Sequence, residues 1–155
     1  MKNWEYSAKS HSLFLLLQSK MKTLDLAAIQ QINLFENVTH SRVKDLFVIN
    51  NETCIFIVEP GDLDKAIGRG GINIKKLTSL LRKRIKVVEF NPDVLLFFTS
   101  LLYPLKPESI EKKEGTLAVT ADTKTKALLI GRDRRNFIVY SRILKAYFNL
   151  ALTIR

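Results

Sequence analysis

The middle of the chain contains the glycine-rich segment Ile67-Gly68-Arg69-Gly70-Gly71-Ile72-Asn73-Ile74-Lys75. Apolar residues at helical spacing flank it, so we expect a short helix that ends near Ile67 and a longer helix that begins near Ile72. Part of the segment returns 63 residues later, where Ile130-Gly131-Arg132 repeats Ile67-Gly68-Arg69 and Asn136 repeats Asn73. A repeat at this period indicates that one supersecondary unit is used twice.

The residues around each copy predict the same order of elements, namely a helix, two antiparallel strands, two helices separated by the loop, and a strand. For the first unit we expect a helix over 24–36, strands over 42–49 and 52–59 joined by an Asn50-Asn51 turn, helices up to 67 and over 72–83, and a strand over 85–90. For the second we expect a helix over 94–102, strands over 109–112 and 116–121, helices from 122 and over 135–148, and a strand over 150–154. Asp62 is expected to cap the short helix of the first unit.

These elements predict an α/β fold with two layered α+β domains in tandem, each a three-stranded mixed sheet with helices on one face. We place an N-terminal extension at 1–22, the first domain at 23–91 and the second at 92–155, with the boundary at Asn91-Pro92-Asp93. The helix after this boundary carries more apolar side chains than one small sheet can cover, among them Leu95, Leu96, Phe98, Leu101 and Leu102. The two domains are therefore expected to pack rigidly against each other.

Charge is concentrated in two short windows. Of the net charge of +10, residues 61–90 contribute eight Lys or Arg against three Asp or Glu, and residues 121–155 contribute eight against two. Residues 1–60 are balanced at six of each, and residues 91–120 have three basic and four acidic side chains. Two basic windows, each centred on a glycine loop, favour contact with a polyanion, although solvated helix faces would give the same composition.

A glycine loop between two helices offers backbone N–H groups to a phosphate and lets a nucleic-acid backbone approach without meeting a Cβ. Known nucleotide motifs do not fit, because a dinucleotide fingerprint needs glycine where Asn73 stands and a P-loop needs Gly-Lys-Ser/Thr, which is absent. The alternative interpretation of Gly68 to Gly71 is a turn that only ends a helix.

The segment from Ile67 to Ile74 resembles the I-G-x-x-G-x-x-I signature of KH domains. Over residues 23–155 the element order is similar to tandem type II KH domains, and the arrangement resembles the short archaeal NusA-like family of transcription factors. This resemblance implies binding of single-stranded RNA and a role in transcription elongation or termination, with RNA polymerase or the ribosome as protein partner. The residues it implies for RNA contact are Ile67, Gly68, Arg69, Gly70, Gly71, Asn73, Lys75 and Lys76 in the first copy, and Gly131, Arg132, Arg134, Arg135 and Asn136 in the second.

The second copy departs from the signature, because Arg134 replaces the closing glycine and Asp133 adds an acid to the loop. Its three arginines are expected to hold phosphate by charge and bidentate hydrogen bonds. The extension at 1–22, with Trp4, Tyr6 and the apolar run 14–17, has no counterpart in the family, and a cap on the first domain is the favoured interpretation.

Other classes of protein receive less support from the sequence. The histidines His11 and His40 lack partners at ligand spacing, so neither a metal nor a cofactor is expected, and no spacing supports a catalytic constellation. A phosphate-handling enzyme stays an alternative, as does a KH-derived protein-interaction or ribosome-associated module with weak RNA binding. The lone Cys54 suggests the cytoplasm, the longest apolar run of 12 residues is too short for a membrane span, and a monomer is expected.

Overall fold

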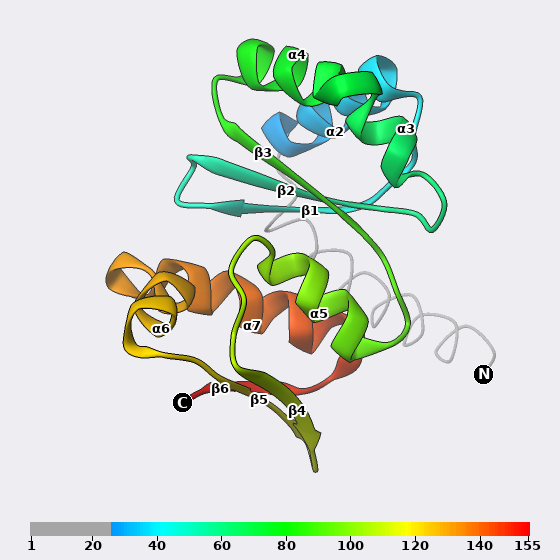
Figure 1. Ribbon diagram of the computed structural model, residues 1–155. Coiled ribbons are helices and arrows are strands. Elements are labelled where there is room, and N and C mark those ends of the chain that lie inside the picture. The colour runs from blue at the N-terminus through cyan, green and yellow to red at the C-terminus, as the bar shows by residue number, and fades with distance from the viewer. Residues whose placement is uncertain (1–25) are drawn as a thin grey trace, which may run out of the picture.

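The computed structural model describes residues 26–155, so the predicted extension at 1–22 lies outside the described residues (Figure 1). The first unit comprises α2 (Leu26–Thr39), β1 (Val43–Ile49), β2 (Thr53–Val58), α3 (Leu63–Ile67), the 3-10 turn η1 (Arg69–Gly71), α4 (Ile72–Leu81) and β3 (Arg84–Glu89). The second comprises α5 (Val94–Leu102), β4 (Ser109–Lys113), β5 (Thr116–Thr120), α6 (Thr123–Ile130), η2 (Arg132–Arg134), α7 (Arg135–Phe148) and β6 (Ala151–Ile154). The order of elements is the same in both, as the repeat predicts.

Each unit has one three-stranded mixed sheet, in the orders β1-β2-β3 and β4-β5-β6. The first two strands of each sheet pair antiparallel, and the last strand runs parallel to the middle one. Asn50 and Asn51 have positive φ values of 50° and 58°, which suits the tight turn between β1 and β2. The predicted α/β fold with two mixed sheets is confirmed. The boundary predicted at residues 91–93 lies in the connection between β3 and α5, and we retain it as a proposal.

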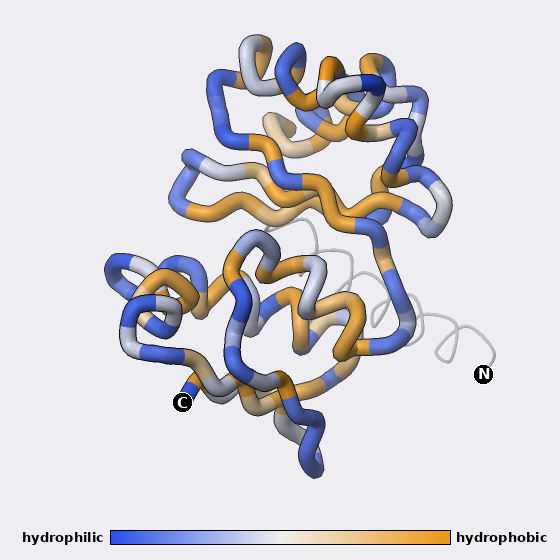
Figure 2. The backbone as a smooth tube through the Cα atoms, viewed as in Figure 1, coloured by the Kyte–Doolittle hydropathy of each residue, from blue (hydrophilic) through white to orange (hydrophobic). Residues whose placement is uncertain are grey.

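The central strand β2 is apolar on both faces, and each face has a different cover. Cys54, Phe56 and Val58 pack with Ala28 and Phe35 of α2 and with side chains of α3 and α4. Ile55 and Ile57, which point the opposite way, belong to a cluster formed mainly by the second unit. The first sheet thus lies between its own helices and α5 and α7, with the second sheet beyond them (Figure 1). In Figure 2 the hydrophobic colour lies along β2 and over most of α5, whereas β3 alternates between hydrophobic and hydrophilic colour.

Helix α5 supplies much of the contact between the units. The side chain of Asp93 caps it by accepting the N–H of Leu95 at 2.9 Å. Phe97, Phe98 and Leu101 are fully buried, whereas Leu95 and Leu96 are 39% and 58% exposed. The 3.6-residue period places 94, 97, 98 and 101 on one face and turns 95 and 96 away from it. The rigid packing expected from this helix therefore rests on Phe98, Leu101 and Leu102, and not on Leu95 or Leu96.

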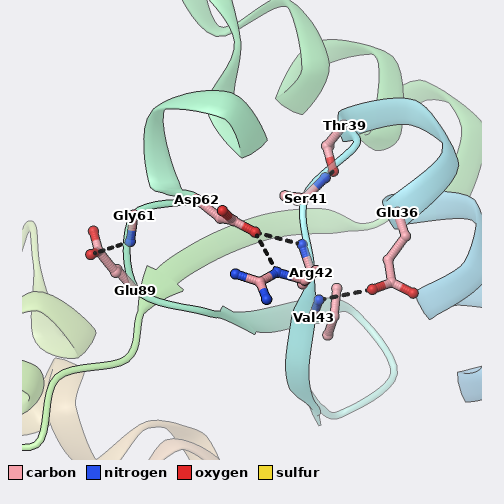
Figure 3. A network of polar contacts seen from close by, with 8 residues as sticks. All are labelled: Glu36, Thr39, Ser41, Arg42, Val43, Gly61, Asp62 and Glu89. Carbon is pink, nitrogen blue, oxygen red and sulfur yellow. Dashed lines mark hydrogen bonds and ion pairs between the residues drawn. The ribbon is translucent and has the colours of Figure 1, made fainter.

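Three carboxylates of the first unit accept backbone N–H groups at the start of β1 and in the loop after β2 (Figure 3). The Asp62 carboxylate accepts the backbone N–H of Arg42 at 2.8 Å, while Glu36 accepts that of Val43 and Glu89 that of Gly61. Asp62 stands at the N-cap position of α3, as expected, but its side chain makes no capping bond and its φ and ψ of −98° and 0° lie outside the extended region usual for a cap. The hydrogen bond from Arg42, with the nearby guanidinium, lowers the pKa of Asp62.

Candidate nucleic-acid interface

The first glycine loop joins α3 to α4 through three glycines with positive φ. Gly68 has φ and ψ of 76° and 169°, a combination that is essentially restricted to glycine. Gly70 (64°, 20°) and Gly71 (74°, 21°) are both left-handed, and the Gly71 N–H donates to the Gly68 carbonyl at 3.1 Å. The backbone thereby turns sharply and starts α4 at Ile72.

The glycines of this loop serve two different purposes. A Cβ on Gly68 would lie 2.8 Å from Nδ2 of Asn73, so glycine is needed there for packing inside the protein. That same Asn73 amide donates to the Lys65 carbonyl at 3.0 Å and ties α4 to α3. At Gly70 and Gly71 a Cβ would meet nothing within 4 Å. The outer part of the loop is therefore open to a ligand.

The second loop has the same backbone in spite of its different sequence. Gly131 has φ and ψ of 74° and 168°, Asp133 55° and 26°, and Arg134 60° and 23°, close to the values of Gly68, Gly70 and Gly71. Asn136 also repeats the contact of Asn73, since its amide donates to the Leu128 carbonyl at 2.9 Å. Replacing the closing glycine has thus changed the side chains of the loop and not its path.

The side chains of the second loop are partly engaged with each other. The Arg134 guanidinium lies 4.7 Å from the centre of the Phe137 ring, and Arg135 forms an ion pair of 3.6 Å with Asp133. Arg132 is exposed. Of the three arginines predicted to hold phosphate, Arg132 alone has no such contact among the residues described, so the second loop offers less free charge than its sequence suggests.

A groove of about 590 Å³ runs from the first loop toward the second unit. Its lining includes Ile67 and Ile74, which flank the first loop in the chain, and residues 84–87 of β3. Because β3 is an edge strand, part of its backbone has no partner within the sheet. Asn136 and Tyr140 of α7 also line the groove. The corresponding groove of the second unit is smaller, about 250 Å³, and both Arg134 and Phe137 line it.

The basic residues near the first loop fall into two groups. Arg69, Lys75 and Lys76 are exposed on the loop and on the first turns of α4. Arg84 and Lys86 line the groove itself, and the sequence did not single them out as ligands. Lys86 donates hydrogen bonds to the carbonyls of Leu101 and Tyr103, and burial lowers its pKa to about 8. The sequence indicates an amphipathic strand over residues 84–89, but this pattern does not show which groups the Lys86 side chain contacts.

Neither a metal-binding cluster nor a membrane-spanning helix is found in the described part of the chain. Within residues 26–155 no group of three or more His, Cys, Asp or Glu side chains is arranged to hold a metal ion. Over the same range no helix is long and apolar enough to cross a membrane.

Comparison with known proteins gives consistent results. Residues 29–98 match the KH domain family. The chain is 33% identical over 98 residues to the probable transcription termination protein NusA of Methanococcus vannielii, a match that covers 63% of this chain and 54% of that protein. The protein of the same name from Halococcus morrhuae is 28% identical over 131 residues, covering 83% of this chain and 94% of the relative. The crystal structure of APE1850 superposes with a TM-score of 0.61 at 28% identity, covering 84% of this chain and 99% of that one.

Proposed function

We propose that this chain binds single-stranded RNA. Its residues 29–98 match the KH domain family, and its second half repeats the same order of elements. The observation that carries this proposal is the position of the open side of the first loop. A Cβ at Gly70 or Gly71 would meet nothing within 4 Å, and the loop that holds them connects Ile67 to α4, whose Ile74 lines the apolar groove together with Ile67. A phosphate can approach the loop while its base enters the groove.

The proposed mechanism divides the nucleotide between two surfaces. The sugar and phosphate lie against the backbone of Gly70 and Gly71 at the start of α4, where the helix dipole favours an anion. Arg69, Lys75 and Lys76 supply the positive charge around this point. Unstacked bases lie against Ile67 and Ile74 and reach the open edge of β3, which requires a single strand because a duplex would keep its bases stacked.

The second loop takes the supporting role in this proposal. Its backbone has the same shape, and Gly131, Arg132, Arg134 and Arg135 are retained as RNA-binding residues, while Asn136 is among the residues that line the first groove. Asn73 and Asn136 have one amide hydrogen bond occupied inside the protein, so each contributes to RNA binding chiefly by holding its loop in place.

The proposed biological role follows from the relatives. Proteins named as probable transcription termination proteins match the chain over most of its length, although the M. vannielii match spans just over half of that protein. We propose a NusA-like elongation or termination factor that acts as a monomer in the cytoplasm, with RNA polymerase as partner and no catalytic activity. The second candidate is a protein-interaction or ribosome-associated module with weak RNA binding. Two observations favour this second candidate: the groove of the second unit is small, and Leu95 and Leu96 are exposed apolar side chains.

Fluorescence anisotropy with a labelled RNA single strand tests the proposal. Affinity should fall steeply with salt, with a slope of about −0.7 in log–log form for each phosphate contact. Unlabelled duplex DNA should compete poorly. If the duplex competes as well as the single strand, the protein reads charge alone and the proposed function is wrong. Weak binding with no salt dependence would instead support the protein-interaction module.

A further inference from the structure

Two hollows of the surface meet at one exposed aromatic ring. The groove of the first loop is joined by a second hollow of about 470 Å³ between α3, β3 and α5. Ile67, Val87, Ser100 and Tyr103 line both. Tyr103 is 65% exposed, and every other aromatic side chain between residues 26 and 155 is buried or half-buried. The fold therefore presents a single open ring, and it does so where these two hollows meet.

The backbone that carries this ring is held in place. Tyr103 ends α5, and its N–H donates to the Thr99 carbonyl at 3.1 Å. Its carbonyl accepts the ammonium of Lys86 on β3 at 2.7 Å, and the same ammonium binds the Leu101 carbonyl. A tyrosine fixed in this way loses little conformational entropy when it binds, since only two side-chain torsions remain free.

The surroundings of the ring suit a nucleobase. An aromatic face accepts any base by stacking, and Ile67 and Val87 provide an apolar floor beside it. Arg84 and Lys86 place positive charge in the groove, while the one carboxylate in the second hollow, Glu89, is occupied by the N–H of Gly61.

We propose that Tyr103 is a base-stacking residue for RNA at the junction of the two units. This inference rests on the proposed function and adds a subsite to it. Stacking removes no counterion, so the ring contributes affinity without changing the salt dependence. The hydroxyl is not needed for stacking, and phenylalanine should replace tyrosine without loss.

The test compares Tyr103→Ala, Tyr103→Phe and Leu96→Ala in the full chain. Leu96 is a matched control because it is exposed on the same helix and lines neither hollow. The probe is a pool of labelled RNA single strands of about 12 nucleotides with randomised sequence. We expect Tyr103→Ala to lower the affinity about five- to tenfold with an unchanged salt slope, and the other two variants to bind like the wild type. A second probe, 5-iodouracil in the same pool, should crosslink to Tyr103.

The possible outcomes separate this inference from the proposed function. If the wild type binds and Gly70→Asp with Gly71→Asp weakens binding, but Tyr103→Ala binds normally, RNA binding stands and the stacking site is wrong. If the wild type shows no preference for single strands, both are wrong. A Tyr103→Ala variant with a lowered melting temperature would not decide the matter by affinity, so crosslinking in the wild type then decides it: crosslinks confined to other residues overturn the proposal.

Discussion

The hydroxyl of Tyr147 donates a hydrogen bond of 2.6 Å to Oδ2 of Asp45, two residues that are 102 positions apart in the chain. Tyr147 lies on α7 and Asp45 on β1, so this bond connects the second unit directly to the sheet of the first. The rings of Phe47, Phe90 and Phe97 surround it. Burial and the Asp45 carboxylate raise the pKa of Tyr147, which keeps the donor proton in place.

The two units should unfold together, and Tyr147→Phe should weaken both. The substitution leaves the partly buried Asp45 carboxylate without its donor, so we expect the free energy of unfolding to fall by about 1–2 kcal/mol. Chemical denaturation followed by circular dichroism measures it. Tyr103→Phe is the control, because its hydroxyl is exposed and its loss should change stability by less than about 0.5 kcal/mol. Separate transitions for the two halves would contradict the shared core.

Gly68→Ala should destabilise the fold more than Gly70→Ala does. Both positions have positive φ, but at Gly68 the added Cβ also meets Asn73 at 2.8 Å, whereas at Gly70 it meets nothing. We expect losses of about 1 kcal/mol at Gly70 and about 2–3 kcal/mol at Gly68. Thermal unfolding of both variants measures the difference.

The double substitution Gly68→Ala with Asn73→Ala serves as the check. It removes the steric conflict and should cost less than the sum of the single changes. Strict additivity would show that the contact with Asn73 is not the reason for glycine at this position.

Much of the fold follows from the sequence, and the reasons are local. The helices Val94–Leu102 and Arg135–Phe148 begin and end as predicted because an aspartate, a glycine loop or a change of hydrophobic period marks their ends. The fully apolar run of β2 indicates two buried faces, but a sequence does not say which segment covers each. In the structure, one face of β2 is covered by the helices of its own unit and the other by α5 and α7 of the second unit.

The candidate site was predictable only where it depends on backbone conformation. Gly70 and Gly71 could be assigned from their spacing because only glycine adopts left-handed torsions readily. The amide bond of Asn73 to Lys65, the position of Lys86 and the exposure of Tyr103 depend on contacts between elements. Spacing within one segment carries no information about such contacts, so the sequence alone predicts neither the internal hydrogen bond of Asn73 nor the exposure of Tyr103.

The pH dependence of stability should reveal the partly buried ammonium of Lys86. Its pKa is lowered from 10.5 to about 8 in the folded protein by burial. Between these values the unfolded chain binds more protons than the folded one, so stability rises with pH across this window. The unfolding free energy of the wild type, relative to that of Lys86→Met, should therefore increase from pH 8 to 10.5. A difference that stays flat or falls over this range would show that Lys86 is not buried in solution.

The ranking of the two loops is the most direct test of the site. Gly70→Asp combined with Gly71→Asp should weaken RNA binding more than Arg132→Ala combined with Arg134→Ala. The carboxylates add two repelling charges at the open side of the loop, where phosphate is proposed to approach. The chain itself shows that the fold accepts such side chains, because Asp133 and Arg134 hold the same left-handed torsions in the second loop.

Removing Arg132 and Arg134 should have a smaller and different effect. It takes away about two electrostatic contacts and should reduce the salt slope by roughly one to two units, while the first loop and its groove stay intact. The matched control for the first loop is Gly70→Asn with Gly71→Asn, which has the same size and the same tolerance of left-handed torsions without the charge. Anisotropy gives the affinities and circular dichroism the fold. If the asparagine pair binds as poorly as the aspartate pair, bulk and not charge closes the loop. If the folded aspartate pair binds RNA as well as the wild type, or if the arginine variant loses more affinity, then the first loop is only a turn and the RNA site lies in the second unit.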